Sequence, residues 1–249
     1  MSPRPVPDAP PRPAARLISL LAVLAGGGLI TALIAGTDET YEHVQEGNGL
    51  AALDQPVLDW MLANRSSGLD SAVTAFTNLG GKVWMSVIAT LAVLALARWW
   101  RSWTPIVLMA VAAAGSTVMT SFGKVLTSRA RPPFVDAVPP YETMPSFPSG
   151  HTLNTAVVAL VLLYLVLCHV ASMAVRVVAT IGLVTFALAM GVSRVYLGHH
   201  WLTDVIAGWT AGAAWAGVVV MGHRLLLALL RRRARHERVA EGPRTTTTH

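Results

Sequence analysis

Residues 194–204 read Arg-Val-Tyr-Leu-Gly-His-His-Trp-Leu-Thr-Asp and place two histidines and an aspartate in an apolar part of the chain. His200 and Asp204 are four residues apart, a spacing that puts two side chains on one face of a helix. Asp204 could then accept a hydrogen bond from one ring nitrogen of His200, leaving the other lone pair free to attack an electrophile. His199 would point about 140° away around the same helix. The spacing therefore predicts His200, and not His199, as a nucleophile.

Fixed positive charges indicate what that nucleophile attacks. Two of the three cations are guanidinium groups, whose forked donors suit phosphate oxygens, and the three are Lys124, Arg131 and Arg194. The tetrapeptide Pro-Ser-Gly-His at 148–151 opens a predicted helix, and the N–H groups and dipole of a helix start attract phosphate. Such a concentration of donors predicts a ligand with several anionic oxygens, so the nucleophile would face phosphorus.

Each residue of the second motif has a predicted role. Ser149 would lie near the N-cap, with its hydroxyl available to the helix or to the ligand. Gly150 lets the backbone approach closely. His151 is a second imidazole, able to protonate a leaving alkoxide and afterwards to deprotonate water.

The elements that must position these residues are membrane helices. The chain of 249 residues is 53% hydrophobic and 13% charged, with a mean hydropathy of +0.53, which is a membrane composition. Stretches of about 20 apolar residues predict an all-α integral membrane protein with six spans at 17–36, 78–97, 104–126, 151–170, 175–195 and 202–223.

The arginines predict the orientation. They lie before the first span, after the second, between the fourth and fifth, and after the sixth: Arg4, Arg12, Arg16, Arg98, Arg101, Arg176, Arg224, Arg231, Arg232, Arg233, Arg235 and Arg238. With six spans these places share one side, which the positive-inside rule makes cytoplasmic, together with both termini. The three polar motifs then meet at the outer face. The net charge of +6 is thus a topology signal, and we expect no nucleic-acid partner because no recognition motif accompanies it.

Composition and the predicted spans divide the chain into three parts. Residues 1–16, rich in proline, are expected to be a disordered cytoplasmic segment, and 231–249 a basic, disordered cytoplasmic tail. The six-helix domain covers 17–230. Within it, 37–77 is an outer loop with a short helix that lies along the membrane interface or simply packs on the domain. The proline-rich segment 127–150 is predicted to be a stiff, non-helical outer loop that carries part of the active site.

The three motifs together resemble the type 2 phosphatidic acid phosphatases. That family carries lysine, six residues and Arg-Pro; then Pro-Ser-Gly-His; then Ser-Arg, five residues, histidine, three residues and aspartate. Here these are Lys124 with Arg131-Pro132, the tetrapeptide 148–151, and Ser193-Arg194 with His200 and Asp204, all in order and with the spacing intact.

The resemblance implies hydrolysis of a lipid phosphate through a phosphohistidine on His200, with His151 protonating the leaving group. It implies that the phosphate is held by Lys124, Arg131, Ser149, Gly150, His151 and Arg194, and that catalysis needs no metal or other cofactor. The expected partners are the lipid substrate and the bilayer of the plasma membrane. The substrate could be undecaprenyl diphosphate, phosphatidic acid, phosphatidylglycerol phosphate or another lipid phosphate, and the oligomeric state is open.

Competing interpretations remain. His200 and Asp204 could be a buried pair that braces two helices, and Lys124 and Arg131 could be cations at a span end. His199, His200 and Asp204 could bind zinc, although the neighbouring cations would repel the metal. A transporter or flippase could use the same pocket without hydrolysis. Vanadate-dependent haloperoxidases share the signature but are soluble, which six spans oppose.

Overall fold

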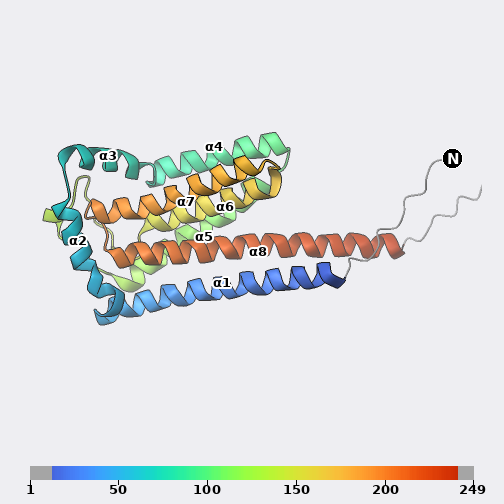
Figure 1. Cartoon of the computed structure of the whole chain (residues 1–249), viewed down its shortest axis with the longest axis horizontal. Helices are drawn as coiled ribbons and strands as arrows, with labels where there is room; N and C mark the ends of the chain where they lie inside the picture. Colours follow the sequence, from blue (N-terminus) through green and yellow to red (C-terminus); the bar gives the residue numbers. More distant parts are fainter. Residues whose placement is uncertain (1–12, 241–249) are drawn as a thin grey trace, which may run out of the picture.

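The computed structural model describes residues 13–240, and within that range every regular element is a helix (Figure 1). The long helices are α1 (Pro13–Glu46), α4 (Lys82–Trp100), α5 (Thr104–Thr127), α6 (Gly150–His169), α7 (Met173–Tyr196) and α8 (Leu202–Ala240). The shorter elements are α2 (Asp54–Ala63), α3 (Ser67–Asn78) and the 3-10 turns η1 (Gly49–Leu53) and η2 (Phe134–Asp136). The predicted all-α class is confirmed for this part of the chain.

Five of these helices are long and apolar enough to cross a membrane: α4, α5, α6, α7 and the Leu202–Ala234 part of α8. They coincide with the second to sixth predicted spans, so a multi-pass membrane protein is confirmed. The predicted first span, 17–36, lies within α1, but its first side chains fall outside the described residues. The count of six and the orientation therefore stay predictions.

One predicted boundary is wrong, and one predicted segment has more helix than expected. Helix α1 continues to Glu46, so the first residues of the predicted outer loop 37–77 are helical, and their place outside the membrane stays a prediction. Helix α8 continues to Ala240, so 231–240 are helical rather than a disordered tail. The physical reason is that this stretch consists mainly of arginine and alanine, which are strong helix formers. Residues 1–12 and 241–249, also predicted to be disordered, lie outside the described part.

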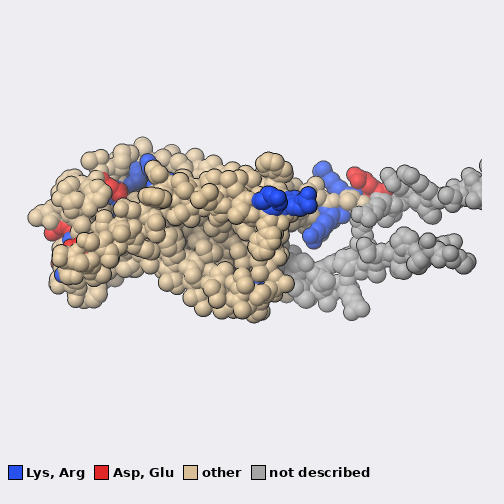
Figure 2. All heavy atoms as spheres, turned by 90° about the horizontal axis from the view of Figure 1, so that it is seen from above, with Lys and Arg blue, Asp and Glu red and all other residues tan. Residues whose placement is uncertain are grey.

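Helix α6 is the centre of the bundle. Leu153, Val157, Val161 and Leu165 recur every four residues along it and are fully buried, as expected for a helix whose apolar face points into a core. Helices α5, α7 and α8 pack against it, and α1 packs along α8, where Figure 1 shows the two side by side. Figure 2 shows an uncharged mid-section, with basic side chains where α8 leaves the bundle.

Helix α2 lies across the end of the bundle at which α7 ends and α8 begins, and α3 runs from there beside α7 toward α4 (Figure 1). The predicted single short helix is therefore two. The side chain of Leu58 is fully buried while Trp60 is 62% exposed, so α2 packs on the domain with one side and leaves the other free. Arg65, between α2 and α3, donates hydrogen bonds to the backbone oxygens of Tyr196 (2.7 Å) and Asp136 (2.6 Å). This side chain thus ties the pair to the end of α7 and to the loop 127–150.

Candidate active site

The turn that delivers His200 is closed by backbone hydrogen bonds at the end of α7. The N–H of His199 donates to the oxygen of Arg194 (3.0 Å), and the N–H of Gly198 donates to the oxygen of Val195 (2.9 Å), which is the Schellman pattern of a helix C-terminus. Gly198 has φ +70, and a Cβ there would collide with the backbone oxygen of Asp136. A side chain at 198 would therefore displace the loop that carries the next part of the site.

His200 and Asp204 are in contact, with 3.2 Å between Nδ1 and Oδ2, and both are almost completely buried. The reasoning from a shared helix face is wrong, because α8 begins only at Leu202 and His200 stands in the preceding turn. Asp204 is the third residue of α8, and its carboxylate accepts the N–H of Trp201 (2.9 Å), as the acidic member of a capping box does. The helix start, not helical periodicity, brings the carboxylate to the imidazole.

His199 points elsewhere. Its Nε2 lies 2.6 Å from the backbone oxygen of Val138, so this ring braces the loop 127–150, and burial lowers its pKa to about 4. Among the described residues, no group of three or more His, Cys, Asp or Glu side chains converges in a way that could hold a metal ion. The two adjacent histidines therefore contact different partners, Val138 and Asp204.

Arg131 connects the loop to the nucleophile. Its Nη1 lies 3.1 Å from His200 Nε2 and donates to the backbone oxygen of His199 (2.5 Å). Because an arginine can only donate, Nε2 must accept, and Nδ1 carries the proton shared with Asp204. Lys124, at the end of α5, donates to the backbone oxygen of Pro145 in the same loop.

Glu142, which the sequence analysis missed, bridges the two arginines. Its Oε2 accepts from Arg131 Nη2 (2.8 Å), its Oε1 accepts from Arg194 Nη2, and His151 Nδ1 lies 3.9 Å from Oε1. Arg194 also donates to Thr77 Oγ1 on α3 (3.2 Å). Two of the three predicted phosphate-binding cations, Arg131 and Arg194, thus converge on one carboxylate.

The Pro-Ser-Gly-His segment is held beside the imidazole by backbone contact. The N–H of Ser149, the N-cap of α6, donates to the backbone oxygen of Asp204 (3.0 Å), so the starts of α6 and α8 are joined. The Ser149 hydroxyl accepts from Thr152 Oγ1 (2.9 Å) and does not cap the helix. Gly150 is the first residue of α6, and a Cβ there would press on Thr120 of α5. His151 follows, facing Glu142.

A second set of residues that the sequence analysis missed holds the Asp204 carboxylate. Arg129 Nη1 pairs with Asp204 Oδ1 (2.5 Å), and its Nη2 pairs with Asp54 Oδ2 (2.6 Å). Asp54, the first residue of α2, accepts from the N–H (2.9 Å) and the hydroxyl (2.7 Å) of Thr203, and so caps α8 from a distant part of the chain. The hydroxyl of Ser146 donates to the other oxygen of Asp204. Every oxygen of the buried carboxylate therefore has a donor, as a buried charge requires.

The charges around the site set the protonation of two groups outside the spans. Burial lowers the pKa of His200 well below 6.5, and the positive charges of Arg131 and Arg194 lower it further, so the imidazole is neutral at neutral pH. Burial would raise the pKa of Glu142, but the positive charges of Arg194 and Arg131 reverse this and hold that pKa at about 2. A neutral imidazole and an ionised carboxylate follow.

Comparison with known proteins shows the family to which this site belongs. The family model of the PAP2 superfamily matches residues 103–226, which contain all eight predicted site residues. The chain belongs to the PAP2 superfamily. It is 26% identical over 170 residues to phosphatidylglycerophosphatase B of Bacillus subtilis (strain 168). This alignment covers 66% of this chain and 80% of that protein. The predicted family is thereby confirmed, and with it the prediction of a hydrolase of lipid phosphates.

Solved structures agree with this PAP2 assignment. The chain resembles the transmembrane PAP2 type phosphatidylglycerolphosphate phosphatase from Bacillus subtilis with a TM-score of 0.71 and 25% identity, covering 76% of this chain and 93% of that one. It resembles Aquifex aeolicus LpxE with a TM-score of 0.53 and 22% identity, covering 68% and 95%. The second likeness concerns the fold alone.

Proposed function

We propose that this PAP2 chain removes the terminal phosphate of a lipid phosphate or diphosphate, through a phosphohistidine on His200 and without a metal cofactor. The observation that carries the proposal is the His200 ring itself. Asp204 engages its Nδ1, so the Nε2 lone pair is directed into the cluster of Arg131 and Arg194. Phosphoryl transfer depends mainly on positioning and charge stabilisation, which fixed cations provide here.

The proposed reaction has two steps. His200 Nε2 forms a bond to phosphorus while the bond from phosphorus to the lipid oxygen breaks, and His151 gives its proton to that oxygen. In the second step His151 takes a proton from water, the water oxygen attacks phosphorus, and the N–P electron pair returns to His200. Lys124, Arg131 and Arg194, with the Ser149 hydroxyl and the N–H of Gly150, would hold the phosphate in both steps.

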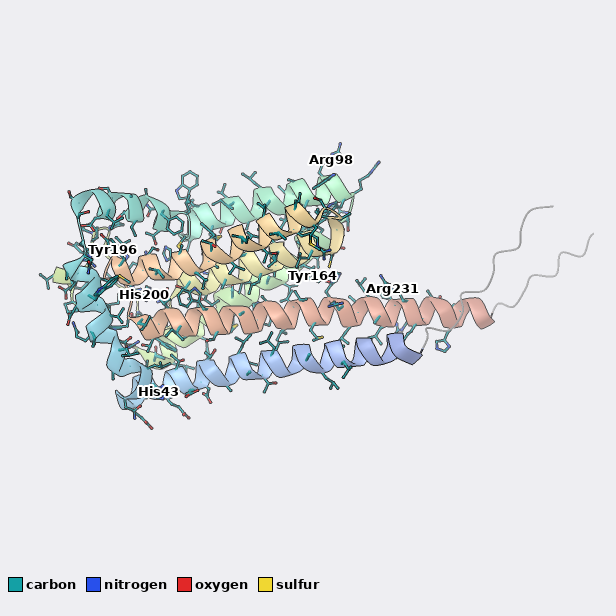
Figure 3. The ribbon with its side chains drawn as sticks, viewed as in Figure 1. His43, Arg98, Tyr164, Tyr196, His200 and Arg231 are labelled. Carbon is teal, nitrogen blue, oxygen red and sulfur yellow. The ribbon has the colours of Figure 1, made fainter. Side chains whose placement is uncertain are left out.

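The proposed site faces the outside of the plasma membrane. His200 lies at one end of the bundle, whereas Arg98 and Arg231 lie at the other (Figure 3). The positive-inside rule assigns the arginine end to the cytoplasm, which supports an outer location for the site. The lipid tails would then stay in the outer leaflet while the headgroup enters the cation cluster.

The orientation can be tested with cysteine labelling. In a Cys168→Ser background, Val135→Cys places a thiol at a 90% exposed position in the loop 127–150, and Ala171→Cys places one at an exposed position between α6 and α7. A membrane-impermeant maleimide added to intact cells is expected to label residue 135 and not residue 171, and permeabilised cells should show both. The reverse pattern would put the site on the cytoplasmic side.

The activity is tested by phosphate release from purified protein over a panel of lipids. Phosphatidylglycerol phosphate comes first, because the Bacillus relative bears the name phosphatidylglycerophosphatase B, followed by phosphatidic acid and undecaprenyl diphosphate. Release with at least one of them, insensitive to chelators, is the expected result. Movement of a labelled lipid between leaflets without phosphate release would favour the transporter instead.

A further inference from the structure

Glu142 lies where a phosphate would have to lie. Its two oxygens contact two different guanidinium groups, Oε2 that of Arg131 and Oε1 that of Arg194. Oε1 also lies 3.9 Å from His151 Nδ1. These are the three side chains to which we assign the phosphate and the leaving group. A carboxylate and a phosphate both accept from guanidinium donors in pairs, so the two anions compete for the same donors.

The carboxylate enters from the open side of the site. The Arg194 side chain is 2% exposed, whereas that of Glu142 is 31% exposed. The neighbouring Tyr141 and Met144 are also exposed, so the segment can swing outward without removing a core side chain. The facing donors of Arg131 and Arg194 are already paired with this carboxylate. A phosphate can therefore take both donors only when the carboxylate leaves.

Charge balance favours a carboxylate beside Arg131 and Arg194 between turnovers. Buried guanidinium groups without a counter-charge are strongly destabilising, and Glu142 supplies one to Arg194 and Arg131. Its own charge is secure, because those cations hold its pKa at about 2. The same cations would bind the product phosphate tightly, and a tethered competitor acts at a high effective concentration.

We propose that Glu142 is an internal anion that occupies the phosphate site between turnovers and returns to displace the product phosphate. The proposal rests on the proposed function, since it assigns a step to that same site. Glu142 is a displacing residue, so its removal should tighten the binding of phosphate, whereas removal of a group that holds phosphate should weaken it.

The test is calorimetric binding of inorganic phosphate to the full-length purified protein in detergent. Glu142→Gln keeps the shape and removes the charge, and phosphate Kd is expected to fall about tenfold, within the usual range for coupling between two ligands. Asp136→Asn is the matched control, because it removes the other acidic charge of the loop 127–150 and should leave Kd unchanged. A second readout is kinetic: Glu142→Gln should release the lipid alcohol in a burst followed by slow phosphate release.

An unchanged or raised Kd in a folded Glu142→Gln protein would overturn the proposal, since the carboxylate would then brace the arginines for the ligand. If that variant unfolds, Glu142→Asp keeps the charge on a shorter side chain, and a smaller fall in Kd is expected. Because binding needs no turnover, the proposed function can fail independently: a chain that hydrolyses no lipid phosphate but shows the tighter binding would keep this inference and lose the reaction.

Discussion

His200→Ala is expected to remove turnover, with a loss on the order of 10⁶ in kcat, the size seen when a covalent nucleophile is deleted. The reason is that the lone pair on Nε2 of this ring is directed at the cation cluster. Nε2 lies 3.1 Å from Arg131 Nη1. The cluster itself does not depend on the imidazole, since Glu142 joins Arg131 to Arg194. Phosphate should therefore still bind to the variant.

Two measurements separate loss of the nucleophile from loss of the fold. Quenching the reaction of a radiolabelled lipid phosphate in alkali should trap label on the parent protein and none on His200→Ala, because phosphohistidine is stable in base. His199→Gln is the matched control: its ring contacts the backbone oxygen of Val138, so this variant should keep the trapped label and lose activity only in part. Turnover by a folded His200→Ala protein would remove the mechanism.

Asp204→Asn is expected to lower kcat by about 10⁴, the size seen when the carboxylate of a catalytic triad becomes an amide. Besides His200 Nδ1–H, three donors face the carboxylate, from Arg129, Ser146 and the N–H of Trp201. An amide has only one acceptor atom, so its NH₂ must face a donor or the His200 ring. In the second case Nδ1 becomes the acceptor, and the lone pair moves away from the phosphate.

The pH profile supplies a readout that a merely structural role would not change. In the parent protein the acid limb of kcat/KM should lie below pH 6.5, because burial and the charges of Arg131 and Arg194 lower the pKa of His200 and protonation removes the lone pair. Asp204→Asn removes a negative charge beside the ring, so this limb should move to still lower pH. Asp59→Asn, on the exposed face of α2, is the control. An unshifted limb with unchanged kcat would contradict the assigned role.

Some of this site could be predicted from the sequence because its parts are local. The six-residue spacing of Lys124 and Arg131, the tetrapeptide 148–151 and the five-residue spacing after Arg194 each fix a group relative to one helix end. Counting spans then placed the three ends together. The contact of His200 with Asp204 was expected for the wrong reason: four residues on a helix and four residues across a helix start both bring side chains together.

The missed residues depend on tertiary contacts that no spacing encodes. Arg129 pairs with Asp54 and Asp204, each 75 positions away, and nothing near Arg129 in the sequence indicates either partner. Glu142 is one of only two acidic residues in the loop 127–150, which is the one signal that could have drawn attention to it. A buried cation cluster needs a counter-charge, and the loop offered two candidates.

The segment formed by α2 and α3 limits how far the chain could be shortened without loss of activity. Thr77, Arg65 and Asp54 lie outside the matched region 103–226, yet they contact Arg194, the end of α7 and the start of α8. A fragment cut to the matched region would keep every motif residue and lose the partners that orient them. Grafting the three motifs into another helical scaffold should fail for the same reason, unless the graft also includes residues that replace the contacts made by α2 and α3.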